Sequence, residues 1–558
     1  MRDYDDAVAF LGEWGPFQRM IFFLLSLSTI PNGFTGVAIV FVGDTPDHKC
    51  VIPVGVNISG EWRNVSIPWE NVDGERKYSQ CRRYKLDEIK RLSDRQLIPG
   101  VDVNITDLEQ EKCVDGWEYR RDTYKSTIVT EWDMVCDDSW KGPLTSSAYF
   151  GGVLFGSFLS GQLSDRFGRK KAFFSTMAIQ TLFNFIEVFS PSWELFCVFH
   201  FFNGMGQISN YVSAYVLGSE ILSKSIRIIY STLGVCICYA IGYMMLPLAA
   251  FFIRDWRILL LILSIPGLFY IPLWWFIPES PRWLLSQGRV QEAEAILRKA
   301  ARMNKVTPPD IIFEPVQPKD NKSEETHVHT ILDLLRSGNI CCITILSCLV
   351  WMILSIGYFA LSLNTSSLHG NIYLNCFSSG AVEVPAYIAT WLLLQNCSRR
   401  LSLFFMLVQG GTVLLFIQLI PQDLTALCVA MEMLGKFGFT SAFAIVYAFT
   451  AELFPTVVRN MAVGVCSMAS RIGSISAPYF VFLGKFDKFL PYILMGSLTI
   501  IAGVLALLLP ESFGVPLPET IDQMQHIKGF KKRKTLYNHN HTAGGDFDSP
   551  DVLMSARL

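Results

Sequence analysis

The sequence predicts an all-α polytopic membrane protein with twelve transmembrane helices arranged as two six-helix halves. Three observations support this fold class. Of the 558 residues, 51% are hydrophobic and only 17% are charged, which suits a membrane protein better than several soluble domains. Twelve apolar runs each approach the about 20 residues that a membrane span needs. Matching motifs recur in the two halves at a constant offset of 232 residues.

The apolar runs divide the chain into an N-terminal segment, two membrane halves, a polar linker and a tail. The boundaries are 1–19, 20–277, 278–338, 339–509 and 510–558. The expected spans of the first half are 20–42, 143–163, 172–190, 195–217, 229–252 and 257–277. Those of the second half are 339–362, 372–394, 402–419, 424–449, 459–483 and 489–509. Within the linker, 291–300 has the pattern of a surface amphipathic helix.

A polar stretch, 43–142, separates the first two spans. Its four cysteines predict two disulfides, although three pairings are possible and the sequence does not choose between them. The stretch also carries three Asn-x-Ser/Thr glycosylation sequons, so we expect an extracellular loop. The cysteines are Cys50, Cys81, Cys113 and Cys136, and the sequon asparagines are Asn57, Asn64 and Asn104.

A tight, positively charged turn joins the second and third spans. Its sequence is Gly161-Gln-Leu-Ser-Asp-Arg-Phe-Gly-Arg-Lys-Lys171, which resembles the loop between helices two and three of the major facilitator superfamily. Its positive charge marks the cytoplasmic side of a membrane, and the basic cluster at 528–534 in the tail agrees. Twelve spans put both termini on one side, so we expect both termini in the cytoplasm.

Three pairs of motifs follow corresponding spans of the two halves. They are Pro278-Glu-Ser280 with Pro510-Glu-Ser512, Glu220 with Glu452, and Arg227 with Arg459. Two such halves with substrate bound between them near the membrane midplane fit the major facilitator fold. The second copy of the charged turn is reduced to Ser398-Arg-Arg400, which predicts an asymmetric gate.

Charged residues gather at the expected cytoplasmic helix ends. We expect opposite charges to meet there and latch the halves together in the outward-facing state. Exposed pairs are each worth about 0–1 kcal/mol, so only a network could set the balance between states. The simpler alternative is that these charges only anchor the topology. The residues are Asp165, Arg166, Arg169, Glu220, Arg227, Glu452 and Arg459.

Arg471 lies deep in the expected eleventh span. An arginine at the centre of a span costs at least about 2.5–3.5 kcal/mol on insertion scales, so we expect it to face a cavity and to have a partner. Glu383, in the eighth span, is the only acid well within the spans of that half apart from Glu432, and it could pair with Arg471. The alternatives are a structural Arg471–Glu383 pair and an arginine that takes a substrate carboxylate by a bidentate contact.

Polar and aromatic residues accompany Arg471 in neighbouring spans. Aromatic faces hold quaternary ammonium groups through the ring quadrupole, and each ring alone is more often core. Together with Arg471 they predict a zwitterionic substrate. The set is Gln207, Asn210, Tyr211, Tyr239, Trp351, Tyr358, Tyr387 and Tyr447.

Five motifs resemble solute carrier family 22, and more narrowly its organic cation/carnitine transporters, the OCTN subgroup. They are Met1-Arg-Asp-Tyr-Asp5, Leu11-Gly-Glu-Trp-Gly-Pro-Phe-Gln-Arg19, Ser126-Thr-Ile-Val-Thr-Glu-Trp132, Gly204-Met-Gly-Gln-Ile-Ser-Asn-Tyr211 and Pro278-Glu-Ser-Pro-Arg-Trp-Leu284. The resemblance covers residues 1 to about 530. It implies a plasma-membrane carrier for carnitine, ergothioneine or organic cations, with sodium coupling for carnitine.

The resemblance also implies roles for individual residues. Substrate contacts would come from Arg471, Asn210, Tyr211 and Tyr239, and sodium dependence from Gln180 and Gln207. Two departures matter. Ser223 replaces a glycine in the phosphate-loop-like stretch 218–225, and Ala556 stands where a PDZ ligand needs Ser or Thr. We therefore expect neither ATP binding nor PDZ scaffolding.

The leading hypothesis is a secondary active transporter in the lipid bilayer that takes up carnitine and related zwitterions, functions as a monomer and has no enzymatic activity. A net charge of −2 argues against a nucleic-acid partner. The alternatives are an ergothioneine or sodium-independent organic cation carrier, and a non-transporting receptor or scaffold. The intact cytoplasmic charges favour transport.

Overall fold

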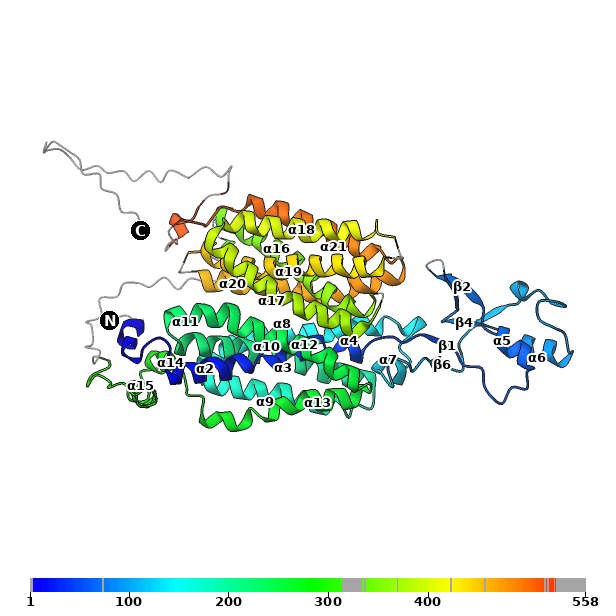
Figure 1. The fold of residues 1–558 in the computed structure, drawn as a ribbon, viewed down its shortest axis with the longest axis horizontal. Helices are drawn as coiled ribbons and strands as arrows, with labels where there is room; N and C mark the ends of the chain where they lie inside the picture. Colours follow the sequence, from blue (N-terminus) through cyan, green and yellow to red (C-terminus); the bar gives the residue numbers. More distant parts are fainter. Residues whose placement is uncertain are drawn as a thin grey trace.

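The computed structural model describes residues 4–72, 75–313, 334–335, 338–368, 370–421, 424–455, 458–515, 518, 521–525 and 527. Two bundles of long helices lie side by side, with a small loop domain projecting from one end (Figure 1). The bundles correspond to the two predicted halves, and the predicted fold class is confirmed by this helical architecture.

The first half contains six helical crossings, two of which are interrupted. The first crossing is α2 (Pro16–Leu27), α3 (Ile30–Val37) and α4 (Ile39–Val42), with Pro31 at the start of α3; proline lacks the amide that a continuous helix needs. The others are α8 (Lys141–Phe167), α9 (Arg169–Glu187), α10 (Trp193–Ile221), α11 (Lys224–Ile229) continued by a π-turn into α12 (Val235–Phe252), and α13 (Trp256–Leu268).

The second half contains six continuous crossings. They are α16 (Gly338–Leu363), α17 (Ile372–Asn396), α18 (Arg399–Ile417), α19 (Thr425–Leu453), α20 (Arg459–Phe482) and α21 (Leu490–Leu508). Among the described residues, eight helical segments are long and apolar enough to span a membrane by composition alone. The remaining crossings, α8, α9, α10 and α20, are more polar because they carry many of the predicted site and gate residues.

The two ends of the bundle differ (Figure 1). The loop end bears the domain formed by 43–142. The terminal end bears α1 (Tyr4–Ala7) and the two linker helices α14 (Pro281–Ser286) and α15 (Val290–Asn304). The predicted surface helix 291–300 lies within α15, and the rest of the linker from 314 to 333 lies outside the described residues.

The loop domain is held by two disulfides, Cys50–Cys113 and Cys81–Cys136. Its three short antiparallel ribbons pair β1 (His48–Cys50) with β6 (Trp117–Tyr119), β2 (Trp69–Val72) with β3 (Glu75–Tyr78), and β4 (Arg82–Tyr84) with β5 (Gln110–Lys112). The helices α5 (Gly60–Val65) and α6 (Leu86–Asp94) complete its small core, and α7 (Ile128–Glu131) follows it. Asn57, Asn64 and Asn104 are all exposed on this domain.

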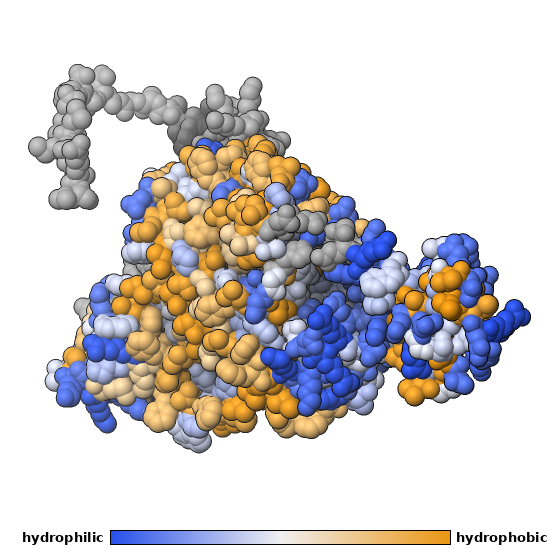
Figure 2. Space-filling model, turned by 45° about the vertical axis from the view of Figure 1, so that its right-hand side comes forward, coloured by the Kyte–Doolittle hydropathy of each residue, from blue (hydrophilic) through white to orange (hydrophobic). Residues whose placement is uncertain are grey.

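Figure 2 shows the hydrophobic side of the bundle beside the more hydrophilic loop domain. Large apolar side chains such as Phe155, Leu182, Leu248 and Phe405 are exposed on the outer helices. Apolar surface of this extent on helices of spanning length is what a lipid environment requires.

Close helix approach sets the position of several polar residues. A Cβ at Gly33 on α3 would lie 2.2 Å from the Tyr239 carbonyl oxygen, and one at Gly242 on α12 would lie 2.1 Å from the Ile30 oxygen. Only glycine fits at such distances. The close contact of α3 with α12 brings Asn32 and Tyr239 to the same region of the first half.

The halves contact each other at the loop end. The Tyr243 hydroxyl lies 2.9 Å from the Ser379 hydroxyl, and Ser147 donates a hydrogen bond to the Ile475 carbonyl at 2.8 Å. The Phe150 and Phe359 rings meet with centroids 4.8 Å apart. At the terminal end, by contrast, the ion pairs among described residues each lie within one half. The contacts named here therefore join the halves at the loop end.

Candidate substrate site

Four tyrosines from both halves converge near the middle of the bundle. The rings of Tyr211 on α10 and Tyr239 on α12 meet edge-on with centroids 6.3 Å apart. Tyr387 on α17 lies close enough to interact electrostatically with both phenol groups, as Tyr447 on α19 does with Tyr211. The structure thus assembles the predicted aromatic residues into one site contributed by both halves.

The second half supplies a continuous aromatic wall to this site. The Tyr447 ring packs against Trp351 with centroids 4.3 Å apart, and Phe443 lies 5.7 Å from Tyr447. Phe443 also lies 5.5 Å from Tyr358. Tyr447 remains 37% exposed, so its ring is available to a ligand. Several rings packed edge-on or tilted in this way can surround a quaternary ammonium group.

Arg471 on α20 is half-buried beside the tyrosines. Its guanidinium interacts electrostatically with the hydroxyls of Tyr149 and Tyr239. Its Nε is buried without a hydrogen-bond partner, and no acidic side chain among the described residues forms an ion pair with it. A buried guanidinium with free donors can accept a carboxylate.

The partner of Glu383 is Lys436 on α19, not Arg471. The Lys436 Nζ lies 3.2 Å from Glu383 Oε1, and both side chains are almost fully buried. Tyr358 donates a 2.6 Å hydrogen bond to the same carboxylate, and Nζ also contacts the Ser362 hydroxyl. The expectation of a structural Arg471–Glu383 pair is therefore wrong for this conformation, because Lys436 already compensates the carboxylate.

Sequence reasoning did not single out Lys436 as a site residue, although a charged residue in the middle of an apolar span is the signal that identified Arg471. Lys436 lies mid-span in Leu434-Gly-Lys-Phe437, and the insertion cost that drew attention to Arg471 applies equally to a lysine there. Its Nζ lies 3.5 Å from the centroid of the Tyr358 ring and 5.7 Å from that of Tyr243. Lys436 therefore adjoins the contact between the halves as well as the substrate site.

A second buried acid that the sequence interpretation passed over is Glu187 on α9. It accepts a 3.0 Å hydrogen bond from Asn203 and contacts His200 Nδ1 at 2.5 Å. The His200 ring lies 4.9 Å from that of Tyr149, which adjoins Arg471. This network stabilises the loop-end half of α9 and α10 behind the substrate site.

Amides line the first-half side of the site. Asn32 on α3 donates to Asn210 Oδ1 at 3.1 Å, and Gln207 donates to the Asn32 carbonyl at 3.2 Å. Gln180 on α9 donates to the Thr35 hydroxyl at 3.5 Å. The side-chain oxygens of Asn32 and Gln180 are buried without a hydrogen-bond donor. Amide oxygens without a donor are suitable ligands for a hard cation.

The predicted gate charges of the first half form a cluster within that half. Arg169 lies 3.0 Å from Glu220 and 2.5 Å from Asp165, and Ser280 donates to Glu220 at 2.5 Å. Gly168 makes the turn before Arg169 possible, since it adopts a φ of 103°. Arg166 is exposed beside the Phe167 ring.

The second half repeats most of this cluster. Arg399 lies 3.2 Å from Glu452, and Ser512 donates to Glu452 at 2.6 Å. The halves differ at Asp165: Arg169 pairs with this carboxylate as well as with Glu220, whereas Arg399 pairs with Glu452 and donates to the backbone oxygen of Leu394. The shortened turn Ser398-Arg-Arg400 therefore keeps the arginine, Arg399, that pairs with the glutamate of this cluster.

Arg227 and Arg459 donate to the carbonyls that end α10 and α19, those of Leu222 and Phe454, both at 3.3 Å. In the part of the chain that the structure describes, no ion pair crosses between the halves at the terminal end. The latch stays a prediction for the opposite conformation. The phosphate-loop-like stretch 218–225 is the junction of α10 and α11 and follows no strand.

Comparisons with known proteins agree with this architecture. Residues 101–524 match the sugar (and other) transporter family. The chain is 60% identical to the organic cation/carnitine transporter 2 of Mus musculus and 59% identical to that of Homo sapiens, over the full length of each protein. It is 58% identical to solute carrier family 22 member 4 of Mus musculus, again over both full lengths. Among solved structures, the match to the inward open xylose transporter XylE from E. coli covers 90% of this chain and 98% of the XylE chain. Its TM-score is 0.58 and the sequence identity is 13%.

Proposed function

Because the chain belongs to the organic cation/carnitine transporters of solute carrier family 22, within the major facilitator superfamily, we propose that it takes up carnitine and related zwitterions across the plasma membrane. Membership in this family makes the protein a membrane transporter. The choice of a zwitterion as its substrate is supported by the chemistry of the central site.

The observation that carries this proposal is the free guanidinium of Arg471 beside the ring cluster. Lys436 neutralises Glu383, which leaves Arg471 as the cation without an ion-pair partner among the described residues of the site. A substrate carboxylate would bind Arg471 through charge-assisted hydrogen bonds. The quaternary ammonium group at the other end would lie against Tyr211, Tyr239 and Tyr447.

Transport would proceed by alternating access of the two halves. The disulfides and exposed sequons of the loop domain support an extracellular loop end, since disulfides persist in oxidising compartments. With that orientation, the contacts of Tyr243, Ser147 and Phe150 close the extracellular side. The described conformation is then inward-facing, with Arg169 and Glu220 paired inside the first half and Arg399 and Glu452 inside the second.

Sodium is the proposed coupling ion for carnitine. The buried side-chain oxygens of Asn32 and Gln180, with the Thr35 hydroxyl, offer hard oxygen ligands. Gln207 and Asn210 orient Asn32 through hydrogen bonds. Sodium held here would favour the α3–α9–α10 arrangement that places Asn210 and Tyr211 in the substrate site. Replacing Gln180 with leucine should therefore reduce the sodium-stimulated component of uptake.

The test compares labelled carnitine with tetraethylammonium, a cation without a carboxylate, in cells expressing Arg471→Gln. Losing a hydrogen bond to a charged group costs roughly 1.5–3 kcal/mol, so apparent carnitine affinity should fall about tenfold to a hundredfold. Tetraethylammonium uptake should fall little or even rise. Arg302→Gln, an exposed change on α15, serves as the matched control. Parallel losses of both substrates at equal surface expression would refute the carboxylate-binding role.

Uptake of carnitine and ergothioneine, each with and without sodium, separates the remaining alternatives. Ergothioneine is also a betaine, so the same arginine and rings would accept it. Sodium-independent uptake of only simple cations would replace the zwitterion proposal with an organic cation carrier. Absence of uptake for every one of these compounds at normal surface expression would favour a receptor or scaffold.

A further inference from the structure

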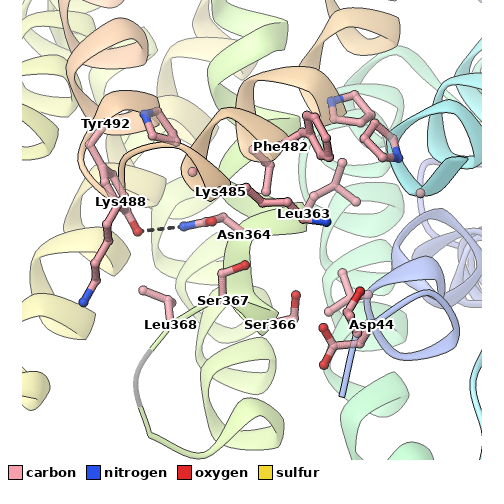
Figure 3. Close-up of a pocket in the computed structure, with 18 of the residues that line it drawn as sticks. Asp44, Leu363, Asn364, Ser366, Ser367, Leu368, Phe482, Lys485, Lys488 and Tyr492 are labelled. Carbon is pink, nitrogen blue, oxygen red and sulfur yellow. Dashed lines mark hydrogen bonds between the residues drawn. The ribbon is translucent and has the colours of Figure 1, made fainter. Parts of the chain in front are cut away.

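A cavity lies at the loop end of the bundle, between the two halves and the base of the loop domain (Figure 3). Its volume is about 750 Å³. The first half and the loop contribute Asp44, Met134 and Ser146, and the second half contributes the end of α16 and the turn between α20 and α21. A volume of this size accommodates a small organic molecule with its hydration water.

Asp44 supplies a negative charge to this outer cavity. Burial raises the pKa of its carboxyl to about 6, and the nearby Tyr124 hydroxyl, Thr45 backbone and Ser366 hydroxyl offset that effect only in part. At neutral pH the carboxylate is still mostly ionised. No basic side chain among the described residues forms an ion pair with it.

Lys485 supplies a positive charge from the opposite half. Partial desolvation lowers the pKa of its ammonium group, and its Nζ lies 5.0 Å from the centroid of the Phe482 ring. In Figure 3 the Lys485 side chain extends across the cavity, and Lys488 is a second lining lysine whose side chain extends in another direction. Lys485 has no carboxylate partner among the described residues, and it does not pair with Asp44.

A hydrogen-bonded group forms a further part of the lining. Asn364 donates to the Tyr492 hydroxyl at 2.7 Å, and Tyr492 donates to Glu432 at 3.0 Å (Figure 3). These bonds fix the walls near Ser366 and Ser367, which also line the cavity. The acids that line the outer cavity are Asp44, Glu432 and Asp487, and its lysines are Lys485 and Lys488, with several neutral polar groups between them.

The closed contact between the halves separates this cavity from the central site. Leu363 and Ser146 line the cavity, while Phe359, one turn deeper on α16, packs on Phe150 at 4.8 Å. The Ser147–Ile475 hydrogen bond lies in the same layer. A molecule arriving from the loop side meets the outer cavity while the central site is closed to it.

We propose that the outer cavity is a second binding site for the transported class of molecule, a small zwitterion with a quaternary ammonium group and a carboxylate, filled from the loop side before the gate opens. The ligand class rests on the proposed function. Asp44 would hold the ammonium group and Lys485 the carboxylate, because each is a charge without an ion-pair partner in a partly enclosed space. A bound zwitterion would compensate both charges at once.

Protection of an introduced thiol measures binding without requiring transport. Ser367→Cys, combined with Cys428→Ser to remove the native cysteine of the cavity, is exposed to a membrane-impermeant maleimide on intact cells. We expect carnitine to slow modification, by about tenfold at ten times its dissociation constant. Asp44→Asn and Lys485→Gln should each raise the protecting concentration about tenfold. Arg302→Gln, an exposed change outside the cavity, should leave it unchanged.

Two further comparisons in the same experiment distinguish binding at the outer cavity from binding at the central site. Arg471→Gln disables the proposed central carboxylate contact, yet protection by carnitine should persist. Tetraethylammonium should protect less well in Asp44→Asn but equally well in Lys485→Gln, since it has no carboxylate. Protection without any carnitine uptake would reject the proposed function and retain the outer site.

Three outcomes would overturn the proposal. Carnitine could fail to protect the thiol with Asp44 and Lys485 intact, which would exclude binding in the cavity. Equal protection in all variants would place the ligand elsewhere. Loss of protection in Arg471→Gln would show that a conformational change, driven from the central site, had shielded the thiol.

Discussion

The buried Lys436–Glu383 pair gives the sharpest stability prediction. Lys436→Met keeps most of the side-chain volume but removes the ammonium group, leaving the Glu383 carboxylate without a compensating charge. The two side chains are 1% and 0% exposed, so water cannot replace the lost partner. Removing one member of such a pair costs about 3–5 kcal/mol.

The loss should be visible as a lower apparent Tm of the detergent-purified protein. With about 2–4 °C per kcal/mol for a unit the size of one half, the expected decrease is roughly 6–20 °C. Glu383→Gln should also destabilise, because it leaves Lys436 as the uncompensated charge. The double variant Lys436→Met/Glu383→Gln removes both charges together. It should restore more than half of the decrease in Tm that Lys436→Met causes.

A double-mutant cycle decides whether the pair acts as a unit. The Tyr358 hydroxyl donates a 2.6 Å hydrogen bond to Glu383, and this bond is retained in Lys436→Met. In the double variant the same hydroxyl can donate to the amide oxygen of the glutamine at position 383. Strictly additive losses in the double variant would refute the argument, because they would show that the two charges do not compensate each other. Fluorescence-detected size-exclusion chromatography after heating supplies the measurement.

Two further predictions concern the loop domain and the terminal-end charges. Glycosidase treatment should convert a smeared gel band of the parent protein into a sharp, faster-migrating band. Joint replacement of Asn57, Asn64 and Asn104, all exposed, should abolish that change in mobility. An unchanged mobility shift in the triple variant would place the sugar elsewhere or invert the topology. Asp165→Asn removes a 73% exposed carboxylate. The predicted latch loses a charge in the outward-facing state, whereas the inward-facing state loses only the exposed pair with Arg169. The ratio of states should therefore change by up to about fivefold towards inward-facing, because a latch contact of this kind contributes about 0–1 kcal/mol. Thiol labelling near Arg227 measures this shift, with Arg302→Gln as control, and unaltered labelling with full transport would leave these residues as topology anchors.

The sequence by itself determined the helical architecture of this protein. Span length, the charged turn at 161–171 and the offset between Glu220 and Glu452 are local or periodic features, and each follows from the cost of placing backbone and charge in a bilayer. The same argument singled out Arg471 as a residue that needs a polar site. Its proximity to Tyr239 and Tyr149 in the structure is consistent with that expectation.

The tertiary structure alone decided which groups compensate one another. Glu383 pairs with Lys436 rather than Arg471, Cys50 pairs with Cys113, and Arg399 takes the place in its half that Arg169 takes in the other. These contacts join residues on different elements, and they depend on how each helix is rotated and how closely it approaches its neighbour. Packing sets both quantities, as Gly33 and Gly242 do for α3 and α12, and the spacing of residues along one chain does not specify them.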